Sequence, residues 1–164
     1  MIRLFLSLLI FSCFACSQAQ ETQDLSLGAE RMDAYLPLFE GKRVALVVNQ
    51  TSTIGQTHLV DTLLSRGVNV VKVMAPEHGF RGEAPDGETI DNTKDPKTGL
   101  PIISIYGKTK KPSAEMLADV DVLIFDIQDV GVRFYTFIST MHYVMEAAAE
   151  NGKKVLVLDR PNPN

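Results

Sequence analysis

Arg43-Val-Ala-Leu-Val-Val-Asn49 holds five consecutive apolar residues between a cation and an amide. An apolar run without alternation is typical of a strand that is buried on both faces of a sheet. The next segment, Thr57 to Arg66, has its three leucines on one helical face and a glycine directly after it, which predicts a helix. Val68 to Ala75 then returns to the strand pattern. Buried strands that alternate with helices predict a parallel sheet covered on both faces.

The rest of the chain continues this alternation. Further strands are expected at Ile102 to Tyr106, Asp121 to Asp126 and Val155 to Asp159, and further helices at Leu25 to Phe39, Ser113 to Ala118 and Phe134 to Glu150. On the last helix, the residues expected to face the core are Ile138, Met141, Met145 and Ala148. The fold class is therefore α/β, doubly wound and mostly parallel. A long polar insertion from Glu77 to Gly99 is expected to be functional, with mobility over its later part from Glu83.

The first residues are predicted to be an export segment rather than part of the fold. One early cation precedes an apolar run from Leu4 to Ile10, which suits a signal peptide but is too short to span a bilayer. Cys16 follows directly after an alanine, which is the pattern of a lipoprotein processing site with this cysteine lipidated. Ordinary secretory cleavage after Ala19 is the alternative. Residues 1–19 are thus assigned to export to the periplasm or to a membrane anchor, and residues 20–164 to one domain.

Composition excludes several other classes of function. Cys13 and Cys16 both lie in the export segment, so the domain is expected to have no disulfide and to depend on its hydrophobic core. A net charge of −4 without a basic run argues against nucleic acid as a partner. His58 is expected at the surface and His142 in packing, and no histidines have metal-ligand spacing, so no metal is expected. No glycine-rich phosphate loop follows the first strand, so no nucleotide cofactor is expected.

Polar clusters follow the predicted strands at the point where each strand ends. In open parallel sheets, ligands bind beyond the carboxyl ends of the strands. Four of the loops that leave these ends begin at Asn49, Glu77, Asp126 and Asp159. Their carboxylates, amides and arginines suit sugar hydroxyls and an anionic substituent. We expect the four loops to lie at the same edge of one sheet and to form the site.

Glu77 and His78 are the sharpest candidate pair in these loops. A carboxyl group on a tight turn acts as a general acid where a partly apolar wall raises its pKa, and Phe80 would supply part of that wall. The alternative is that Glu77 caps the following turn and His78 fills a polar gap. An alternative role for Asp126 is that of the nucleophile in a haloacid-dehalogenase-type phosphatase. That family needs a second aspartate two residues further on, where this chain has Gln128.

Four motifs in these loops resemble those of one protein family. They are Leu46-Val-Val-Asn-Gln-Thr-Ser52, Ala75-Pro-Glu-His-Gly-Phe-Arg-Gly82, Asp126-Ile-Gln-Asp-Val-Gly-Val-Arg-Phe-Tyr-Thr136 and Leu158-Asp-Arg-Pro-Asn-Pro-Asn164. With these motifs in this order, the chain resembles the YbbC/NamZ family over Leu25 to Asn164. The resemblance implies a Rossmann-like N-terminal domain and a smaller C-terminal lid domain, with a cleft between them. The lid is absent from this chain, which is therefore expected to be a fragment.

The activity that the resemblance implies is release of terminal β-linked N-acetylmuramic acid from peptidoglycan fragments during cell-wall recycling. This sugar carries a lactyl carboxylate, and arginine binds carboxylates bidentately. The candidates to bind that carboxylate are Arg81, Arg133 and Arg160. The candidates to hold the sugar hydroxyls or the acetamido group are Asn49, Gln128, Asp129 and Asn162.

Glu77 is expected to act as proton donor or base, with His78 as its partner. Three routes are compatible with the sequence: a carboxylate nucleophile, an inverting water, and attack by the 2-acetamido oxygen of the substrate itself. The alternative function is a non-catalytic exported lipoprotein that captures muropeptide sugars. It needs the same polar edge but no catalytic carboxyl group.

Overall fold

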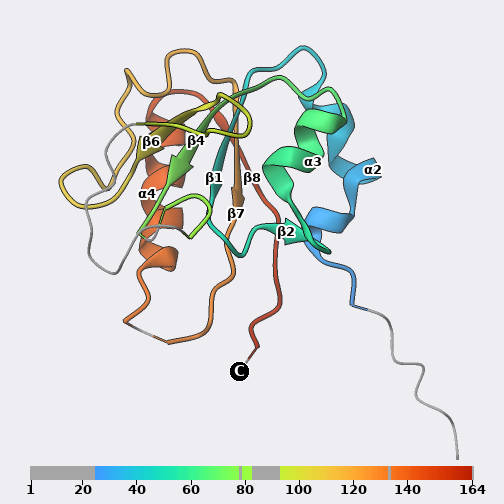
Figure 1. Ribbon diagram of the computed structural model, residues 1–164. Helices are drawn as coiled ribbons and strands as arrows, with labels where there is room; N and C mark the ends of the chain where they lie inside the picture. The colour runs from blue at the N-terminus through green and yellow to red at the C-terminus, as the bar shows by residue number, and fades with distance from the viewer. Residues whose placement is uncertain (1–24, 78, 83–92, 133, 164) are drawn as a thin grey trace, which may run out of the picture.

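A six-stranded sheet forms the centre of the domain (Figure 1). The computed structural model describes residues 25–77, 79–82, 93–132 and 134–163. The sheet has the strand order β5-β6-β4-β1-β7-β8. The strand bounds are β1 (Val44–Val48), β4 (Val70–Ala75), β5 (Thr93–Lys94), β6 (Pro101–Ser104), β7 (Val122–Asp126) and β8 (Lys154–Val157). The predicted α/β class is confirmed.

Five of the six strands run parallel. β1 pairs with β4 and with β7, β4 pairs with β6, and β7 pairs with β8, all in parallel. Only the short β5 is antiparallel to its neighbour β6 within the described sheet. β5 lies in the polar insertion that was expected to be mobile from Glu83 to Gly99, so at least its Thr93–Lys94 part is tied to the sheet. Residues 83–92 of that insertion lie outside the described residues.

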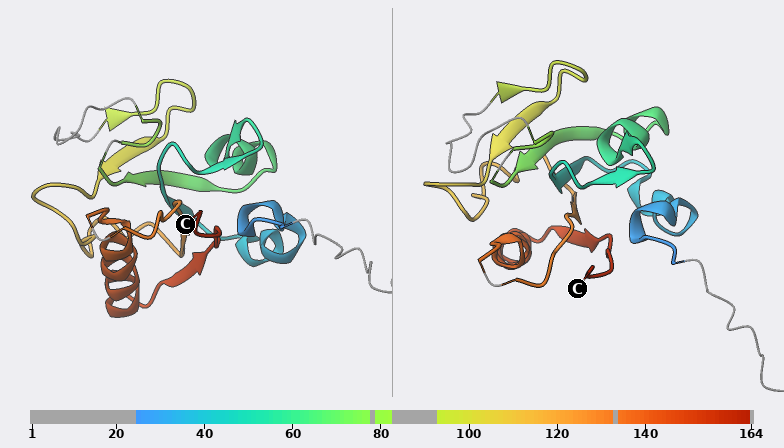
Figure 2. Two further views of the ribbon diagram at one scale, coloured as in Figure 1. Left: turned by 90° about the horizontal axis from the view of Figure 1, so that it is seen from below. Right: turned by 60° about the horizontal axis from the view of Figure 1, so that its bottom comes forward.

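Helices cover both faces of the sheet, as Figure 2 shows. On one face lie the short helices η2 (Gly28–Glu30), α2 (Met32–Tyr35) and η3 (Leu36–Phe39), together with α3 (Leu59–Ser65). On the other face lies α4 (Phe137–Glu150). A separate two-stranded hairpin, β2 (Thr53–Ile54) and β3 (Thr57–His58), leads into α3 and was not predicted. In the described part of the chain, no helix is long and apolar enough to cross a membrane.

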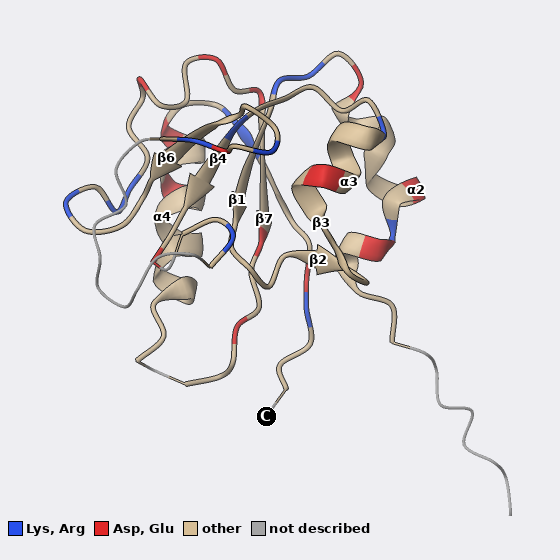
Figure 3. Ribbon diagram, in the orientation of Figure 1, with Lys and Arg blue, Asp and Glu red and all other residues tan. Residues whose placement is uncertain are grey.

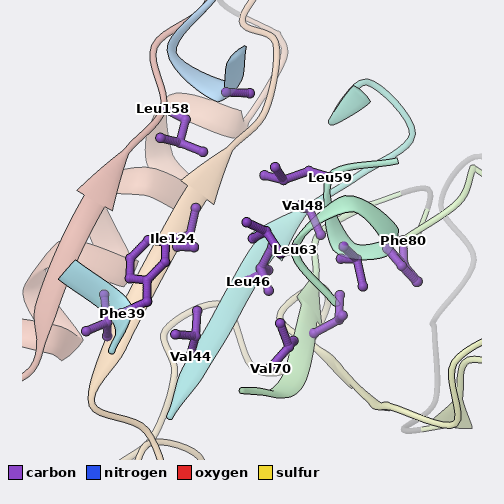
Figure 4. Packing of buried hydrophobic residues seen from close by; sticks show 14 of the residues in the cluster. Phe39, Val44, Leu46, Val48, Leu59, Leu63, Val70, Phe80, Ile124 and Leu158 are labelled. Atoms are coloured by element: carbon purple, nitrogen blue, oxygen red, sulfur yellow. The ribbon is translucent and has the colours of Figure 1, made fainter. Parts of the chain in front are cut away.

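The central strand β1 contributes to the cores on both faces. Its odd and even positions alternate: Leu46 and Val48 join the cluster under α3, whereas Val47 joins the cluster under α4. Figure 4 shows Leu46 and Val48 beside Leu59 and Leu63 of α3. Each fully buried leucine of this kind contributes about 1.5–3 kcal/mol to folding. All five residues of the strand are buried, because a hydrophobic cluster covers each of its faces.

Three sequence-based helix predictions need correction. The segment from Leu25 to Phe39 is not one helix but three short helices, one α-helix between two 3-10 helices, and Pro37 stands at the start of the last one, where it removes a backbone donor. The helix expected over residues 113–118 is absent, since residues 114–119 form turns. α4 begins at Phe137 rather than Phe134. Of its expected core residues, Ala148 is buried and Met141 packs against the core, as predicted. Its expected core residues Ile138 and Met145 are 57% and 49% exposed.

The N-terminal turns dock on the far end of β8 through a glycine. The backbone N–H of Gly28 donates to the Asp159 carbonyl at 2.9 Å. A Cβ atom at position 28 would lie 2.5 Å from the Asp159 nitrogen. Only a residue without a side chain fits this contact, which joins the first and last described segments of the domain.

Candidate active site

The carboxyl ends of the parallel strands meet at one edge of the sheet, which confirms the placement expected from the sequence. Asn49, Glu77 and Asp159 follow the ends of β1, β4 and β8 at this edge, and Asp126 is the last residue of β7. Tyr106, which follows β6, joins them there. Charged residues of both signs occur along the loops of this edge (Figure 3). These loops form the carboxyl edge of the domain.

Glu77 is held by a tyrosine that the sequence analysis did not single out. The Tyr106 hydroxyl donates to Glu77 Oε1 at 2.6 Å, and both side chains are half-buried. This hydrogen bond and burial raise the pKa of the Tyr106 hydroxyl above its ordinary value. The phenol therefore stays protonated and acts as a donor. Sequence offered one indirect signal, since Glu77 stands just beyond one predicted strand and Tyr106 is the last residue of another.

Three of the predicted residues lie outside the described residues. They are His78, the expected partner of Glu77, Arg133, an expected ligand of the lactyl carboxylate, and Cys16, the expected lipidation site. Phe80, which was expected to form a wall beside Glu77, is buried and packs edge-on against the ring of His58 at 4.7 Å between centroids.

Asp126 and Arg160 form a buried ion pair that spans three loops. Arg160 Nε and Nη2 donate to the two Asp126 carboxylate oxygens at 2.5 Å and 2.9 Å, and Nη2 also donates to the Thr53 carbonyl at 2.9 Å. Burial raises the pKa of Asp126, whereas the Arg160 charge lowers it, and burial dominates. Arg160 is thus engaged within the protein. Asp126 is enclosed, which speaks further against its role as a phosphatase nucleophile.

Asn49 shapes the loop that leaves β1 and is completely buried. Its Oδ1 accepts from the Thr51 backbone N–H at 2.9 Å and from the Thr51 hydroxyl at 2.6 Å. Ser52 continues the chain of contacts, because its hydroxyl accepts from the Asn49 N–H and donates to the Asp126 carbonyl. Asn49 Nδ2 has no hydrogen-bond partner among the described residues. The structure places this side chain under the carboxyl edge rather than on its surface.

Arg81 lies between two aspartates. Its Nε and Nη2 donate to the Asp95 carboxylate at 3.0 Å and 2.9 Å, and its Nη2 and Nη1 donate to the Asp61 carboxylate at 3.1 Å and 3.3 Å. The guanidinium also stacks over the Phe80 ring, with its carbon 4.3 Å from the ring centroid. Arg81 lowers the pKa of Asp95 to about 2. These contacts fasten the polar insertion to α3.

Gln128 and Asn162 join the loops that follow β7 and β8. Gln128 Nε2 donates to the Asp129 and Pro161 carbonyls, both at 2.8 Å. Asn162 packs directly over Gly131, where a Cβ atom would lie 2.4 Å from Asn162 Nδ2. Gly131 has a φ of 71°, a conformation that other residues rarely adopt. Asp129 is exposed, and one of its carboxylate oxygens accepts from the next backbone N–H at 2.9 Å.

The shape of the surface offers three kinds of hollow. One of about 360 Å³ lies at the carboxyl edge between α4 and β8 and is mostly apolar, with Asp129, Arg160 and Asn162 on its rim. A polar one of about 300 Å³ lies beside Gln50 and Arg81. Another of about 380 Å³ lies at the opposite edge of the sheet, far from the predicted site residues. Volume alone therefore does not identify the site, and the convergence of polar groups makes the carboxyl edge the candidate.

Both predictions for the described histidines were wrong. His58 is buried, caps α3 by accepting from the Val60 N–H at 3.2 Å through Nδ1, and contacts the Asn49 carbonyl at 2.9 Å through Nε2. These partners require a neutral ring with its proton on Nε2. Burial lowers its pKa, in agreement. His142 is exposed rather than packed.

A parallel α/β domain with convergent polar side chains at the carboxyl edge is typical of enzymes and binding proteins for small polar ligands. The chain belongs to the NamZ family, since the family model described as "Exo-beta-N-acetylmuramidase NamZ, N-terminal" matches residues 44–164. This confirms the resemblance found in the sequence motifs.

Three relatives illustrate the match. The Bacillus subtilis protein named peptidoglycan beta-N-acetylmuramidase NamZ is 50% identical over 133 residues, which are 79% of this chain and 32% of that protein. Crystal structures of two DUF1343 family proteins from Bacteroides fragilis are each 47% identical and have TM-scores of 0.72 and 0.76. Each match covers 84% of this chain and 35% of the solved chain. The chain thus spans about a third of the length of these relatives.

Proposed function

We propose that this chain carries the catalytic carboxyl group of an exo-acting glycoside hydrolase, which releases terminal β-linked N-acetylmuramic acid from peptidoglycan fragments in cell-wall recycling. Membership of the NamZ family and the name of the Bacillus subtilis relative support a muramidase. The observation that carries the proposal is the Glu77 carboxyl group, held by Tyr106 at the edge where parallel sheets bind ligands.

Glu77 acts in this proposal by moving a proton at the glycosidic oxygen. The carboxyl group protonates the leaving oxygen as the bond to the sugar carbon breaks, and a water molecule finally takes the place of the leaving sugar. The Tyr106 hydrogen bond fixes the side chain in one orientation, which proton transfer within hydrogen-bond reach requires.

The lactyl carboxylate distinguishes the substrate from N-acetylglucosamine, and an arginine is the residue suited to bind it. Arg81 and Arg160 are already bound to internal carboxylates. Arg133 is therefore the arginine proposed for this role, on the sequence alone. Arg133→Ala should weaken transition-state binding of a muramide by about 2–5 kcal/mol, measured from kcat/KM. The kcat/KM for the matching glucosaminide should stay unchanged. Equal losses on both substrates would count against it.

The experiment that tests the function is turnover of a chromogenic β-N-acetylmuramide by the natural full-length protein and by its Glu77→Gln variant. Glutamine keeps the shape and can accept the Tyr106 hydrogen bond but cannot exchange a proton. Turnover in the wild type, loss of turnover in Glu77→Gln and retained sugar binding support the proposal. Glu115→Gln, an exposed substitution, is the control. Sugar binding by a wild type without turnover would favour the alternative, a capture lipoprotein.

A cleft with two walls is also part of the proposal. The carboxyl edge of this chain would supply one wall, and a lid domain the other. Residues 21–164 should then fold but turn over little substrate, since catalytic geometry tolerates little looseness and water must be kept out. Turnover by residues 21–164 close to that of the full-length protein would show that no second wall is needed.

Export and lipid anchoring are proposed on the leader sequence. The peptidoglycan fragments of the proposed reaction lie outside the cytoplasm, which agrees with an export segment over residues 1–19. Cys16→Ser should move the protein from the membrane fraction to the soluble fraction. An unchanged membrane fraction would exclude this cysteine as the anchor point.

A further inference from the structure

Tyr106 and Glu77 are brought together by the register of the sheet. β4 and β6 are parallel neighbours, and Ala75 pairs with Ser104 at their carboxyl ends. The Ile105 N–H extends this pairing by donating to the Ala75 carbonyl at 3.0 Å. Glu77 and Tyr106 each lie two residues beyond the paired positions. Their contact therefore rests on strand pairing and not on a chance meeting of two loops.

The direction of the hydrogen bond distinguishes the two carboxylate oxygens of Glu77. The Tyr106 hydroxyl donates to Oε1 at 2.6 Å. A phenol remains protonated at neutral pH, and here its pKa is raised further, so it keeps donating through a reaction cycle. With Oε1 occupied as an acceptor, the proton that Glu77 exchanges is carried by Oε2.

We propose that Tyr106 is a positioning residue, which orients the Glu77 carboxyl group so that Oε2 is the oxygen that gives its proton to the leaving group of the substrate. This inference rests on the proposed glycosidase function and adds a residue and an atom to it. Tyr106 does not touch the reacting atoms. Its effect is on the fraction of Glu77 side chains that are aimed at the glycosidic oxygen.

A tyrosine next to a glutamate also permits a different role, since some glycosidases use tyrosine as the nucleophile with a neighbouring carboxylate as its base. That role requires Tyr106 to lose its proton as the glycosidic bond breaks. Positioning needs only the hydrogen bond between the Tyr106 hydroxyl and Glu77 Oε1 that the structure shows, and no transfer of the phenolic proton. The two roles differ in what removal of the hydroxyl does to the rate.

The test is Tyr106→Phe in the natural full-length protein, which keeps the ring and removes only the hydroxyl. We expect kcat to fall about 10- to 100-fold with KM changed less than about threefold, because orientation of a catalytic group is lost while substrate binding is retained. The loss should be larger for a muramic-acid disaccharide, whose sugar leaving group needs a proton, than for the 4-nitrophenyl muramide, whose leaving group needs little help. A residue with a purely structural role would affect both substrates equally.

Tyr143→Phe is the matched control, because Tyr143 lies on α4 and its ring contacts that of His142. An unchanged kcat in Tyr106→Phe on both substrates would overturn the proposal, and so would an equal loss on both. Complete loss of turnover together with a sugar bound covalently to the wild-type tyrosine would also overturn it, in favour of a nucleophile. If the wild type itself does not turn over muramides, the proposed function fails, and this outcome is distinct from a failure of the Tyr106 role.

Discussion

Replacement of Arg160 by methionine removes the charge that compensates a buried carboxylate. The side chain of Asp126 is 0% exposed and that of Arg160 is 5% exposed, so water can replace neither partner. Methionine has a similar unbranched length and no charge. The variant therefore loses both contacts to Asp126 and the contact to the Thr53 carbonyl, and it leaves a carboxylate stranded in the interior.

The expected loss of stability is large for a single substitution. Removal of one partner of a buried ion pair costs about 3–5 kcal/mol, because the remaining charge keeps its desolvation penalty without its counter-charge. Domains of this kind have a total stability of about 5–15 kcal/mol. Since 1 kcal/mol shifts the Tm of a domain of about 150 residues by about 2–4 °C, we expect a fall of about 6–20 °C.

The loss should depend on pH in a defined direction. Burial already raises the pKa of Asp126, and Arg160 is the charge that lowers it. Without Arg160 the pKa rises further, so the folded variant takes up a proton at a pH where the unfolded chain does not. Below the unfolded pKa, Asp126 is protonated in both the folded and the unfolded chain, so the variant buries no charge. As pH rises through the folded pKa, the folded variant must bury a carboxylate and loses that stability. The deficit of Arg160→Met relative to the wild type is therefore largest at neutral pH and shrinks toward acidic pH.

Thermal and urea unfolding, followed by circular dichroism, measure these differences. Arg43→Met is the control, because Arg43 forms a similar two-point pair with Asp121 whose side chains are 44% and 33% exposed. Solvent screens that pair, so its loss should be much smaller. Adding Asp126→Asn to Arg160→Met should restore part of the stability, because no charge is then stranded. A loss in Arg160→Met no larger than in Arg43→Met, or one independent of pH, would refute the reasoning.

Three further substitutions probe the core, a buried histidine and a close backbone contact. Leu63→Ala should cost about 2–5 kcal/mol in urea unfolding, because Leu63 is fully buried, whereas Leu38→Ala at an exposed site should stay within about 0.5 kcal/mol. The pKa of His58 is lowered from 6.5, chiefly by burial. The neutral ring therefore stabilises the fold above pH 6.5, and this stabilisation is lost as pH falls through the folded pKa. His58→Gln should therefore flatten the fall of Tm between neutral and mildly acidic pH, and an unchanged slope would contradict this. Gly28→Ala should cost about 1–3 kcal/mol because its Cβ meets the backbone of Asp159, whereas the exposed Ser26→Ala should be neutral in the same measurement.

The strands were more predictable from the sequence than the helices. β1, β4 and β7 lie within one or two residues of their predicted bounds. Their unbroken apolar runs are typical of strands that are buried on both faces of a parallel sheet. The core face of α4 was predicted correctly at Met141 and Ala148 and incorrectly at Ile138 and Met145. Helical spacing fixes which residues share a face, but Phe137 and Ile138 are both apolar, and only contacts with the sheet select Phe137 for burial.

The location of the candidate site was predictable, but the partners of its residues were not. The carboxyl ends of parallel strands meet at one edge in any order of strands, so Asn49, Glu77 and Asp126 could be grouped from the sequence. Tyr106 was missed because its closeness to Glu77 depends on β6 lying next to β4. The arginine contacts were missed because a guanidinium binds an internal aspartate and a substrate carboxylate with the same hydrogen bonds. The sequence does not show which of the two carboxylates an arginine binds.

The position of β1 in the middle of the sheet determines when the domain can fold. Its neighbour β7 lies far along the chain. The Arg43 N–H donates to an Asp121 carboxylate oxygen that is 78 residues away in sequence. Chains that depend on such distant pairings fold in about milliseconds to seconds, more slowly than helical bundles. Until residues 122–126 pair with it, the apolar run of β1 lacks a partner on one side. An unpaired apolar strand of this kind is prone to aggregate before the sheet is complete.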